Sequence, residues 1–296
     1  MPGRAASALP WAVRATWAVL PFAAGPVLAA ALDPRAETLR ATASAGLWLG
    51  WAVVVVAVLV PHPLGLTTLR LLAPASLAAT AVAVATAGSD VGGVPSALGL
   101  GATTVASALA VLPETGTWLV NGGAYGGERR HLLRPPLALL AGPIPVAGGL
   151  LLVALASGPL LLAAGRTVTG VLALAAGLPL ALVLGRALHA LTQRWAVLVP
   201  AGLVIKDHLA VVDPVLLRRV DIEVLRPAPP GTDALDLTAG APGLALEARL
   251  LEAVPLARVV LGTRRSEPGR SAALRFTPTR PGTVLAEARA RRIRVG

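Results

Sequence analysis

The sequence contains no cysteine, one lysine, one tyrosine and few charged residues. Without cysteine the chain has no disulfide, no thiolate nucleophile and no Cys-ligated zinc or iron–sulfur site. Only 14% of the 296 residues are charged and 55% are hydrophobic, which gives a mean hydropathy of +0.73. A soluble domain carries about 25% charged residues, and a disordered chain needs low hydrophobicity. The composition therefore indicates a membrane protein.

The sequence also lacks the local motifs of common enzyme classes. The histidines never approach HxxxH or HExxH spacing, and no GxSxG, Walker A or GxGxxG-plus-acid pattern occurs. His208 with Asp207 and Asp213 would allow a carboxylate–histidine pair, but alternation in a hairpin explains this spacing equally well. We therefore expect no catalytic residue, no metal site and no cofactor. The histidines are His62, His131, His189 and His208.

Six apolar stretches are long enough to cross a bilayer as helices. An apolar helix needs about 20 residues to span the hydrocarbon core, with a working range of about 17 to 25. The second stretch, with consecutive valines from Val53 to Val56, is the clearest, and the fourth is the weakest because small residues dominate it. The predicted spans are residues 11–32, 42–60, 65–86, 96–112, 137–156 and 168–188.

The first span has a second interpretation. Arg4 and Arg14 precede an apolar run that ends in the alanines 29–31, as in a signal peptide with a small-residue cleavage site. We favour an uncleaved helix, because five further spans already commit the chain to the membrane. In the second span Gly46 and Gly50 form a GxxxG pair, which is either a helix-packing motif or a product of the glycine-rich composition.

The arginines are distributed unequally between the two sides of the six spans. Eight lie on the side of the N-terminus and three on the other, so the positive-inside rule places both termini in the cytoplasm. No ionisable residue lies near the middle of a span, which argues against a proton- or ion-coupled transporter. The eight are Arg4, Arg14, Arg70, Arg129, Arg130, Arg134, Arg186 and Arg194, and the three are Arg35, Arg40 and Arg166.

Residues 113–136, between the fourth and fifth spans, are the one long loop expected in the membrane part. Loops of this length are often functional. Aromatic rings suit the membrane interface, glycine-flanked turns bind anions, and arginines beside a span attract anionic headgroups at about 1 kcal/mol each. The alternative is that the arginines only enforce topology. The candidate lipid or partner contacts are Trp118, Asn121, Tyr125, Arg129, Arg130, His131 and Arg134.

The composition changes after Gln193, and residues 192–296 hold 16 of the 26 Lys and Arg residues and 10 of the 15 Asp and Glu residues. Short runs of Val, Leu and Ile recur between turns with Pro and Gly, which predicts a small β-sandwich or β-barrel. Residues 281–293 predict a closing helix, with Pro281 in its first turn and arginines near its end. The predicted strands are residues 195–199, 202–206, 209–212, 216–225, 243–250, 256–261 and 272–277.

Three pieces of this region carry a resemblance to a known family. Residues 195–204 look like an opening hairpin, residues 219–225 like a mid-domain strand, and residues 275–278 precede the helix. With these strands and the closing helix, the region resembles the bacterial pleckstrin-homology-like domains that follow transmembrane helices. The resemblance breaks down at Pro227–Gly240. The whole chain also looks like the polytopic membrane proteins of unknown function common in actinobacteria. Neither resemblance implies a catalytic residue.

The predicted architecture is an α-helical transmembrane bundle of six helices at residues 1–191, followed by a small β-rich cytoplasmic domain at residues 192–296. The leading hypothesis is a non-enzymatic protein of the cytoplasmic membrane whose soluble domain binds a protein or a lipid headgroup. A second hypothesis is a transporter or channel for a neutral or lipidic solute, with Gly148 and Gly149 lining a broken fifth span.

A third hypothesis is a membrane enzyme that acts on a lipid substrate with Glu114, His131 and nearby arginines. Nucleic acid is not an expected partner in any of these hypotheses. The basic residues of the tail are interleaved with acids, and aromatic side chains that could stack on bases are few.

Overall fold

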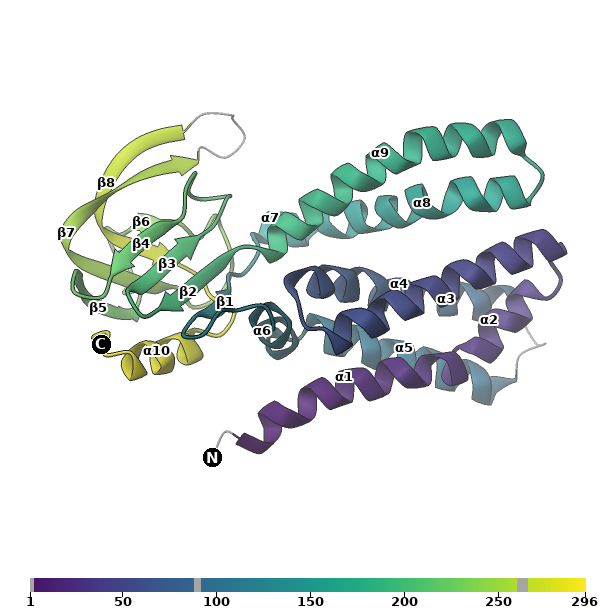
Figure 1. Ribbon diagram of the computed structural model, residues 1–296, viewed down its shortest axis with the longest axis horizontal. Helices are drawn as coiled ribbons and strands as arrows, with labels where there is room; N and C mark the ends of the chain where they lie inside the picture. Colours follow the sequence, from purple (N-terminus) through teal and green to yellow (C-terminus); the bar gives the residue numbers. More distant parts are fainter. Residues whose placement is uncertain (1–2, 88–91, 260–265) are drawn as a thin grey trace. The chain divides into compact units, whose positions relative to one another are not determined.

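In a computed structural model the chain folds into two compact units, each made from two separate pieces of sequence (Figure 1). The structure describes residues 3–87, 92–259 and 266–296. The first unit, here called the helical unit, comprises Met1–Gly122 and Val146–His189. The second, here called the sheet unit, comprises Gly123–Pro145 and Ala190–Gly296. The chain therefore passes between the units three times.

In the described residues, six helical segments are long and apolar enough to cross a membrane by length and composition, which confirms the prediction of six long apolar helices. Two of these segments are built from two helices each, α1 with α2 and α7 with α8. The helices before the last strands are α1 (Gly3–Ala23), α2 (Gly25–Leu32), α3 (Glu37–Leu59), α4 (Pro63–Ala87), α5 (Gly93–Val111), α6 (Pro113–Asn121), α7 (Leu137–Leu140), α8 (Pro143–Ala163) and α9 (Thr167–Thr192).

Two reciprocal hydrogen bonds join α1 to α3. The Trp17 indole N–H donates to the Trp51 carbonyl at 2.9 Å, and the Trp51 indole N–H donates to the Trp17 carbonyl at 3.0 Å. Pro21 has no N–H, so the Trp17 carbonyl four residues earlier lacks its ordinary helical donor. An unsatisfied carbonyl is unfavourable where water is absent, and the Trp51 indole supplies the missing donor.

Helices of the helical unit approach closely where a glycine meets a neighbouring backbone. A Cβ at Gly65 would lie 2.9 Å from a carbonyl oxygen of α3, and a Cβ at Gly177 would lie 2.5 Å from a carbonyl oxygen of α8. Small residues permit such contacts in membranes. The predicted GxxxG pair makes no such contact, because in the described part of the chain a Cβ at Gly46 or Gly50 would meet nothing within 4 Å. The packing interpretation of that pair is therefore wrong within one chain.

The described residues of the sheet unit form two four-stranded sheets and a final helix. The first sheet has the antiparallel order β1-β2-β3-β4, and the second has the order β5-β7-β8-β6 with β6 parallel to β8. The pairings of the described strands close no barrel, so the barrel alternative was wrong. The elements are β1 (Arg129–Leu132), β2 (Trp195–Val199), β3 (Gly202–Lys206), β4 (Val215–Arg218), β5 (Ile222–Pro227), β6 (Leu235–Asp236), β7 (Leu246–Val259), β8 (Ser266–Phe276) and α10 (Pro281–Ala290).

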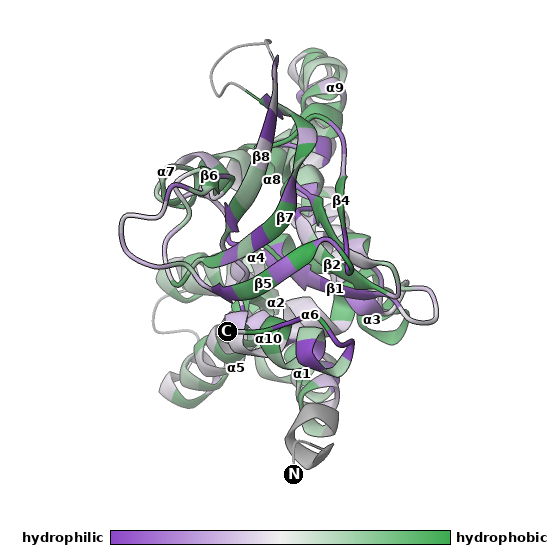
Figure 2. Ribbon diagram, turned by 90° about the vertical axis from the view of Figure 1, so that its left-hand side faces the viewer, coloured by the Kyte–Doolittle hydropathy of each residue, from purple (hydrophilic) through white to green (hydrophobic). Residues whose placement is uncertain are grey.

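One apolar core lies within the sheet unit and receives side chains from both sheets and from α10. Leu198 of β2 pairs with Leu203 of β3, and both are fully buried with Phe276 of β8 and Val284 of α10. Strands of this unit mix hydrophobic and hydrophilic residues, whereas the long helices are mostly hydrophobic (Figure 2). That mixture is what a strand with one buried face requires.

Strand β1 comes from the segment that the sequence predicted to be a loop. Residues 113–136 contain α6 and β1, so the loop prediction was wrong. Along its whole length β1 pairs with β2. On its other side the Arg134 N–H donates to the Thr277 carbonyl and the Thr279 N–H donates to the Leu132 carbonyl, both at 2.8 Å. The segment therefore lies between β2 and the residues that follow β8, and it links the two sheets.

The remaining strand predictions differ mainly in where strands begin and end. Residues 195–199 and 202–206 form β2 and β3 as predicted. Residues 209–212 form a turn with an isolated bridge at Val211, while residues 256–259 continue β7 instead of starting a new strand. Residues 260 and 261 of that predicted strand lie outside the described residues.

Candidate functional site

Two of the sequence candidates, Trp118 and Asn121, lie on α6 in the helical unit. The Arg14 guanidinium is 5.3 Å from the centre of the Trp118 ring, and its Nε donates to the Val58 carbonyl at 3.0 Å, near the end of α3. A cation there satisfies a carbonyl that has no helical donor and interacts favourably with the macrodipole. Asn121 Nδ2 donates to the Thr117 carbonyl at 2.8 Å. Both candidates are thus engaged within the helical unit.

Other polar side chains of the helical unit also bind helix ends or neighbouring helices. Arg70 Nε on α4 donates to the Ala110 carbonyl at 3.4 Å, one residue before the end of α5. Thr67 Oγ1 and His189 Nδ1 lie 2.9 Å apart and join α4 to α9. These groups therefore stabilise helix packing and do not converge on one site.

Tyr125 and Arg130 lie in and just after the turn that leads into β1. The Tyr125 side chain is 84% exposed. Arg130 donates to both carboxylate oxygens of Glu128, at 2.9 Å and 3.2 Å, and this hydrogen bonding lowers the pKa of Glu128. The Arg130 guanidinium is 4.7 Å from the Trp195 ring centre, and the Lys206 ammonium is 4.8 Å from it. Two cations thus share one indole ring in a cation–π arrangement.

His131 is buried between β1 and α10. It is 4% exposed, and its Nε2 lies 3.3 Å from Glu287 Oε2 without hydrogen-bond geometry. Burial lowers the pKa of His131 below its ordinary 6.5, although the nearby Glu287 carboxylate acts in the opposite direction. One turn further along α10, Arg291 Nη2 donates to the Gly127 carbonyl at 2.9 Å. Helix α10 therefore lies along β1 and the turn before it.

Arg134 lies beside the most deeply buried ion pair of the sheet unit. Arg194 is 1% exposed and donates to both Asp207 carboxylate oxygens at 2.7 Å, while its Nη1 donates to the Arg134 carbonyl at 2.9 Å. Removing one partner of such a pair costs about 3–5 kcal/mol, because the other charge is left buried. Asp207 also accepts from the Leu209 N–H, and His208 is exposed. Asp207 is therefore engaged in holding β2 and β3 together.

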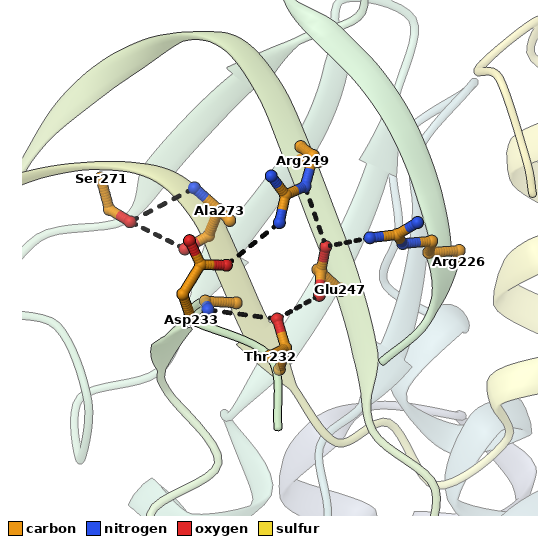
Figure 3. Close-up of polar contacts among 8 residues, drawn as sticks. Arg226, Thr232, Asp233, Glu247, Arg249, Ser271 and Ala273 are labelled. Atoms are coloured by element: carbon orange, nitrogen blue, oxygen red, sulfur yellow. Dashed lines mark hydrogen bonds and ion pairs between the residues drawn. The ribbon is translucent and has the colours of Figure 1, made fainter. Parts of the chain in front are cut away.

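A second buried carboxylate, Glu247 on β7, holds the connection between β5 and β6 (Figure 3). It accepts hydrogen bonds from Arg226 at 3.0 Å, Arg249 at 3.2 Å and Thr232 at 2.5 Å, and Arg249 also donates to Asp233 at 3.1 Å. Burial alone would raise the pKa of Glu247, but these donors outweigh it and lower the pKa. The network explains how a Pro- and Asp-rich connection, where the family resemblance breaks down, is fixed to the second sheet.

Unpaired positive charge gathers at the end of α10. Arg129, Arg289, Arg292 and Arg294, here called the basic surface, are exposed. Within the described ranges none of the four lies within 4.0 Å of a carboxylate oxygen. Several other arginines of the sheet unit are paired with carboxylates, whereas Arg270 donates to the Ala253 carbonyl. The paired ones are Arg194, Arg218, Arg226, Arg249, Arg258 and Arg275.

The sequence placed the α10 arginines at a helix end but gave no signal that associates them with Arg129. The two parts of the basic surface are some 160 residues apart in the chain, and the segments that carry them contact each other through Arg291 with Gly127 and through Glu287 with His131. Of the seven sequence candidates, Arg129 belongs to this surface and Tyr125 is exposed on the adjoining turn. Arg130, His131 and Arg134 are engaged inside the sheet unit.

In residues 3–87, 92–259 and 266–296, no group of three or more His, Asp or Glu side chains is placed to hold a metal ion. No protein-family model, no curated protein and no solved structure matches the chain. The arrangement of its own residues is therefore what bears on function.

Proposed function

We propose that this is a multi-pass protein of the cytoplasmic membrane that holds the sheet unit at the inner membrane surface, where the unit binds a lipid headgroup or a protein and performs no catalysis. The path of the chain carries the proposal. The chain leaves the helical unit after Gly122, returns after Pro145 and leaves again after His189. A domain on one linker reorients freely, whereas three covalent connections restrict it. Such attachment suits a unit that presents a surface at a fixed place.

Exposed apolar side chains on the long helices support the membrane location. Soluble monomers rarely expose contiguous apolar patches larger than a few hundred Å². Here the exposed side chains occur along all the long helices, and they would contact lipid. Among the most exposed are Trp11, Phe22, Val82, Val94, Val153, Val168 and Val183. The excess of arginine on the N-terminal side of the spans supports a cytoplasmic sheet unit.

A pleckstrin-homology-like sheet unit is part of the proposal. Two sheets followed by one helix support it. The parallel pairing of β6 with β8 and the origin of β1 upstream of α7 are departures that the resemblance did not imply.

The two alternative hypotheses have weaker support. His131, one of the residues named in the lipid-enzyme hypothesis, is buried against Glu287. The break between α7 and α8 falls at residues 141–142, about 7 Å along the helix axis from the start of the span. The middle of the hydrocarbon core lies about 15 Å from its edge. A transport path would use a break near the middle of the bilayer.

The test is photo-crosslinking of the full-length protein in intact membranes. A photoreactive amino acid replaces Tyr125, Val220 or Leu251, which are all well exposed on the sheet unit. The same amino acid at the fully buried Phe276 gives the background. We expect a discrete lipid or protein adduct from at least one exposed position. If all three positions give only the Phe276 background, the proposal is wrong.

A further inference from the structure

The basic surface has three properties that bear on its partner: its arginines have no carboxylate beside them in the described ranges, they lie on segments that contact each other, and one of them is held in an unfavourable backbone conformation. Elsewhere in the sheet unit several arginines have a carboxylate beside them, as with Arg218 and Asp221 or Arg275 and Asp236. The basic surface has no such carboxylate within reach in the part of the chain that is described. An anion supplied by another molecule would meet uncompensated charge there.

The contact between these segments follows from how α10 lies on β1. Glu287 faces His131, and one turn later Arg291 binds the Gly127 carbonyl, so the helix ends beside the turn that contains Tyr125. The chain after α10 then turns back along β5, where the Arg294 carbonyl accepts the Leu225 N–H at 2.8 Å. Arg289 lies on α10, Arg292 and Arg294 follow it, and Arg129 lies on β1, so the four arginines belong to segments that contact each other; Figure 1 shows α10 and β1 in the sheet unit.

Arg292 ends α10 in the left-handed region, with φ of 60°. Helices commonly end with a residue in this conformation, and it is usually glycine because a Cβ is disfavoured there. An arginine at this position gives up backbone stability and contributes an exposed charge. A residue held in this conformation on a positively charged surface suggests that the surface has a function.

We infer that the basic surface docks the sheet unit onto an anionic phospholipid bilayer, the same membrane that the helices cross. This inference rests on the proposed function and names the lipid surface as the partner. Arg291, beside Arg292 in the chain, binds the Gly127 carbonyl, and the candidate span Leu137–Ala163 begins ten residues after Gly127, so a membrane is the nearest extended anionic surface along the chain. Each arginine close to such a surface contributes to binding, and the contribution vanishes at high salt.

The exposed Tyr125, two residues before Gly127, adds an aromatic ring with a polar edge, a side chain that partitions to the headgroup region. Acidic protein surfaces are the competing partner. They would bind the same charges without any dependence on the lipid composition of the membrane.

The experiment uses the full-length chain in lipid nanodiscs. Because the protein has no cysteine, Ala290→Cys at the end of α10 carries a single fluorophore. Nitroxide on the lipid headgroups quenches this fluorophore at short range. We expect stronger quenching when phosphatidylglycerol replaces part of the phosphatidylcholine, and reversal at about 0.5 M salt, where the screening length falls below about 5 Å.

The variant R289Q/R292Q/R294Q should lower the ratio of docked to undocked protein about 100-fold and so remove the lipid dependence. The matched control R219Q/R258Q/R270Q removes three exposed arginines from the β4–β5 turn and the β7–β8 hairpin. This variant should keep the dependence of quenching on anionic lipid. Arg292→Gly removes one charge and at the same time relaxes the backbone. We expect it to lower the ratio of docked to undocked protein about fivefold, and unfolding cannot be the cause of this loss.

Quenching that is the same in neutral and anionic nanodiscs would overturn the inference, as would equal losses in the two triple variants. A protein adduct from Tyr125 together with lipid-independent quenching would overturn the lipid partner while leaving the proposed function standing. Absence of every adduct at the sheet unit would instead overturn the proposed function.

Discussion

Leu133→Ala tests the most consequential feature of the fold, the completion of the sheet unit by a segment from between two membrane spans. Leu133 is 4% exposed and belongs to the apolar core, and its N–H donates to the Arg194 carbonyl at 3.0 Å. Truncating a buried leucine costs about 2–5 kcal/mol, because apolar contacts are lost and a cavity remains. If residues 113–136 were a surface loop, the same change would cost no more than about 0.5 kcal/mol.

Native-state hydrogen exchange of the full-length protein measures this difference. Amides of β2 and β3 should exchange about 30-fold to 4,000-fold faster in Leu133→Ala, since each 1.4 kcal/mol corresponds to about tenfold. Leu137→Ala is the matched control, because Leu137 is four residues away and 57% exposed. Equal exchange of β2 and β3 in the two variants would refute the assignment of β1 to the sheet unit.

Three further predictions concern helix packing and pH. Trp51→Phe leaves the Trp17 carbonyl without a donor and should destabilise the helical unit by about 1 kcal/mol, measured as thermal unfolding in detergent. Pro21→Ala restores the helical N–H donor and should therefore reduce the destabilisation caused by Trp51→Phe. The control is Trp48→Phe at an exposed tryptophan, whose effect on stability should not depend on Pro21→Ala. Additive effects of the Pro21 and Trp51 changes would contradict this account. Gly177→Val should lower the unfolding temperature, because its Cβ would lie 2.5 Å from a carbonyl oxygen of α8. Gly185→Val is the control, because a Cβ at Gly185 meets nothing within 4 Å. Similar unfolding temperatures of the two variants would argue against close packing of α8 and α9. Burial lowers the pKa of His131 from 6.5, so the unfolded chain binds the proton more readily and the stability of the sheet unit should be complete above pH 6.5 and decline as the pH falls below it. Urea unfolding across this range should show a shallower decline in His131→Gln, and an unchanged slope would exclude His131 as the cause.

The parts of the fold that were predictable are those set by local sequence. Six spans follow from apolar runs matched to the thickness of a bilayer, and the structure has helices at each. The β2–β3 hairpin follows from two apolar runs separated by Pro200 and Ala201. At its start β3 needs Gly202, because a Cβ there would collide with the Leu217 carbonyl oxygen.

The parts that were not predictable depend on partners far away in the chain. Strand β1 has four residues, two of them arginine, and no alternating apolar pattern. Its stability comes from β2 and from residues 277–279, which local reading cannot associate with it. The burial of a carboxylate such as Glu247 cannot be predicted from the sequence either, because a glutamate at the same position would be expected on an exposed strand face. The basic surface depends on the packing of α10 along β1 for the same reason.

Side-specific labelling of single cysteines tests the central claim, a six-span protein with the sheet unit inside. In the cysteine-free chain, Ala164→Cys lies in the exposed turn between α8 and α9, and Val220→Cys lies on the exposed turn between β4 and β5. With a membrane-impermeant maleimide on intact cells, we predict labelling at 164 at once and at 220 only after the membrane is permeabilised. Labelling of 220 on intact cells, with 164 protected, would contradict the account.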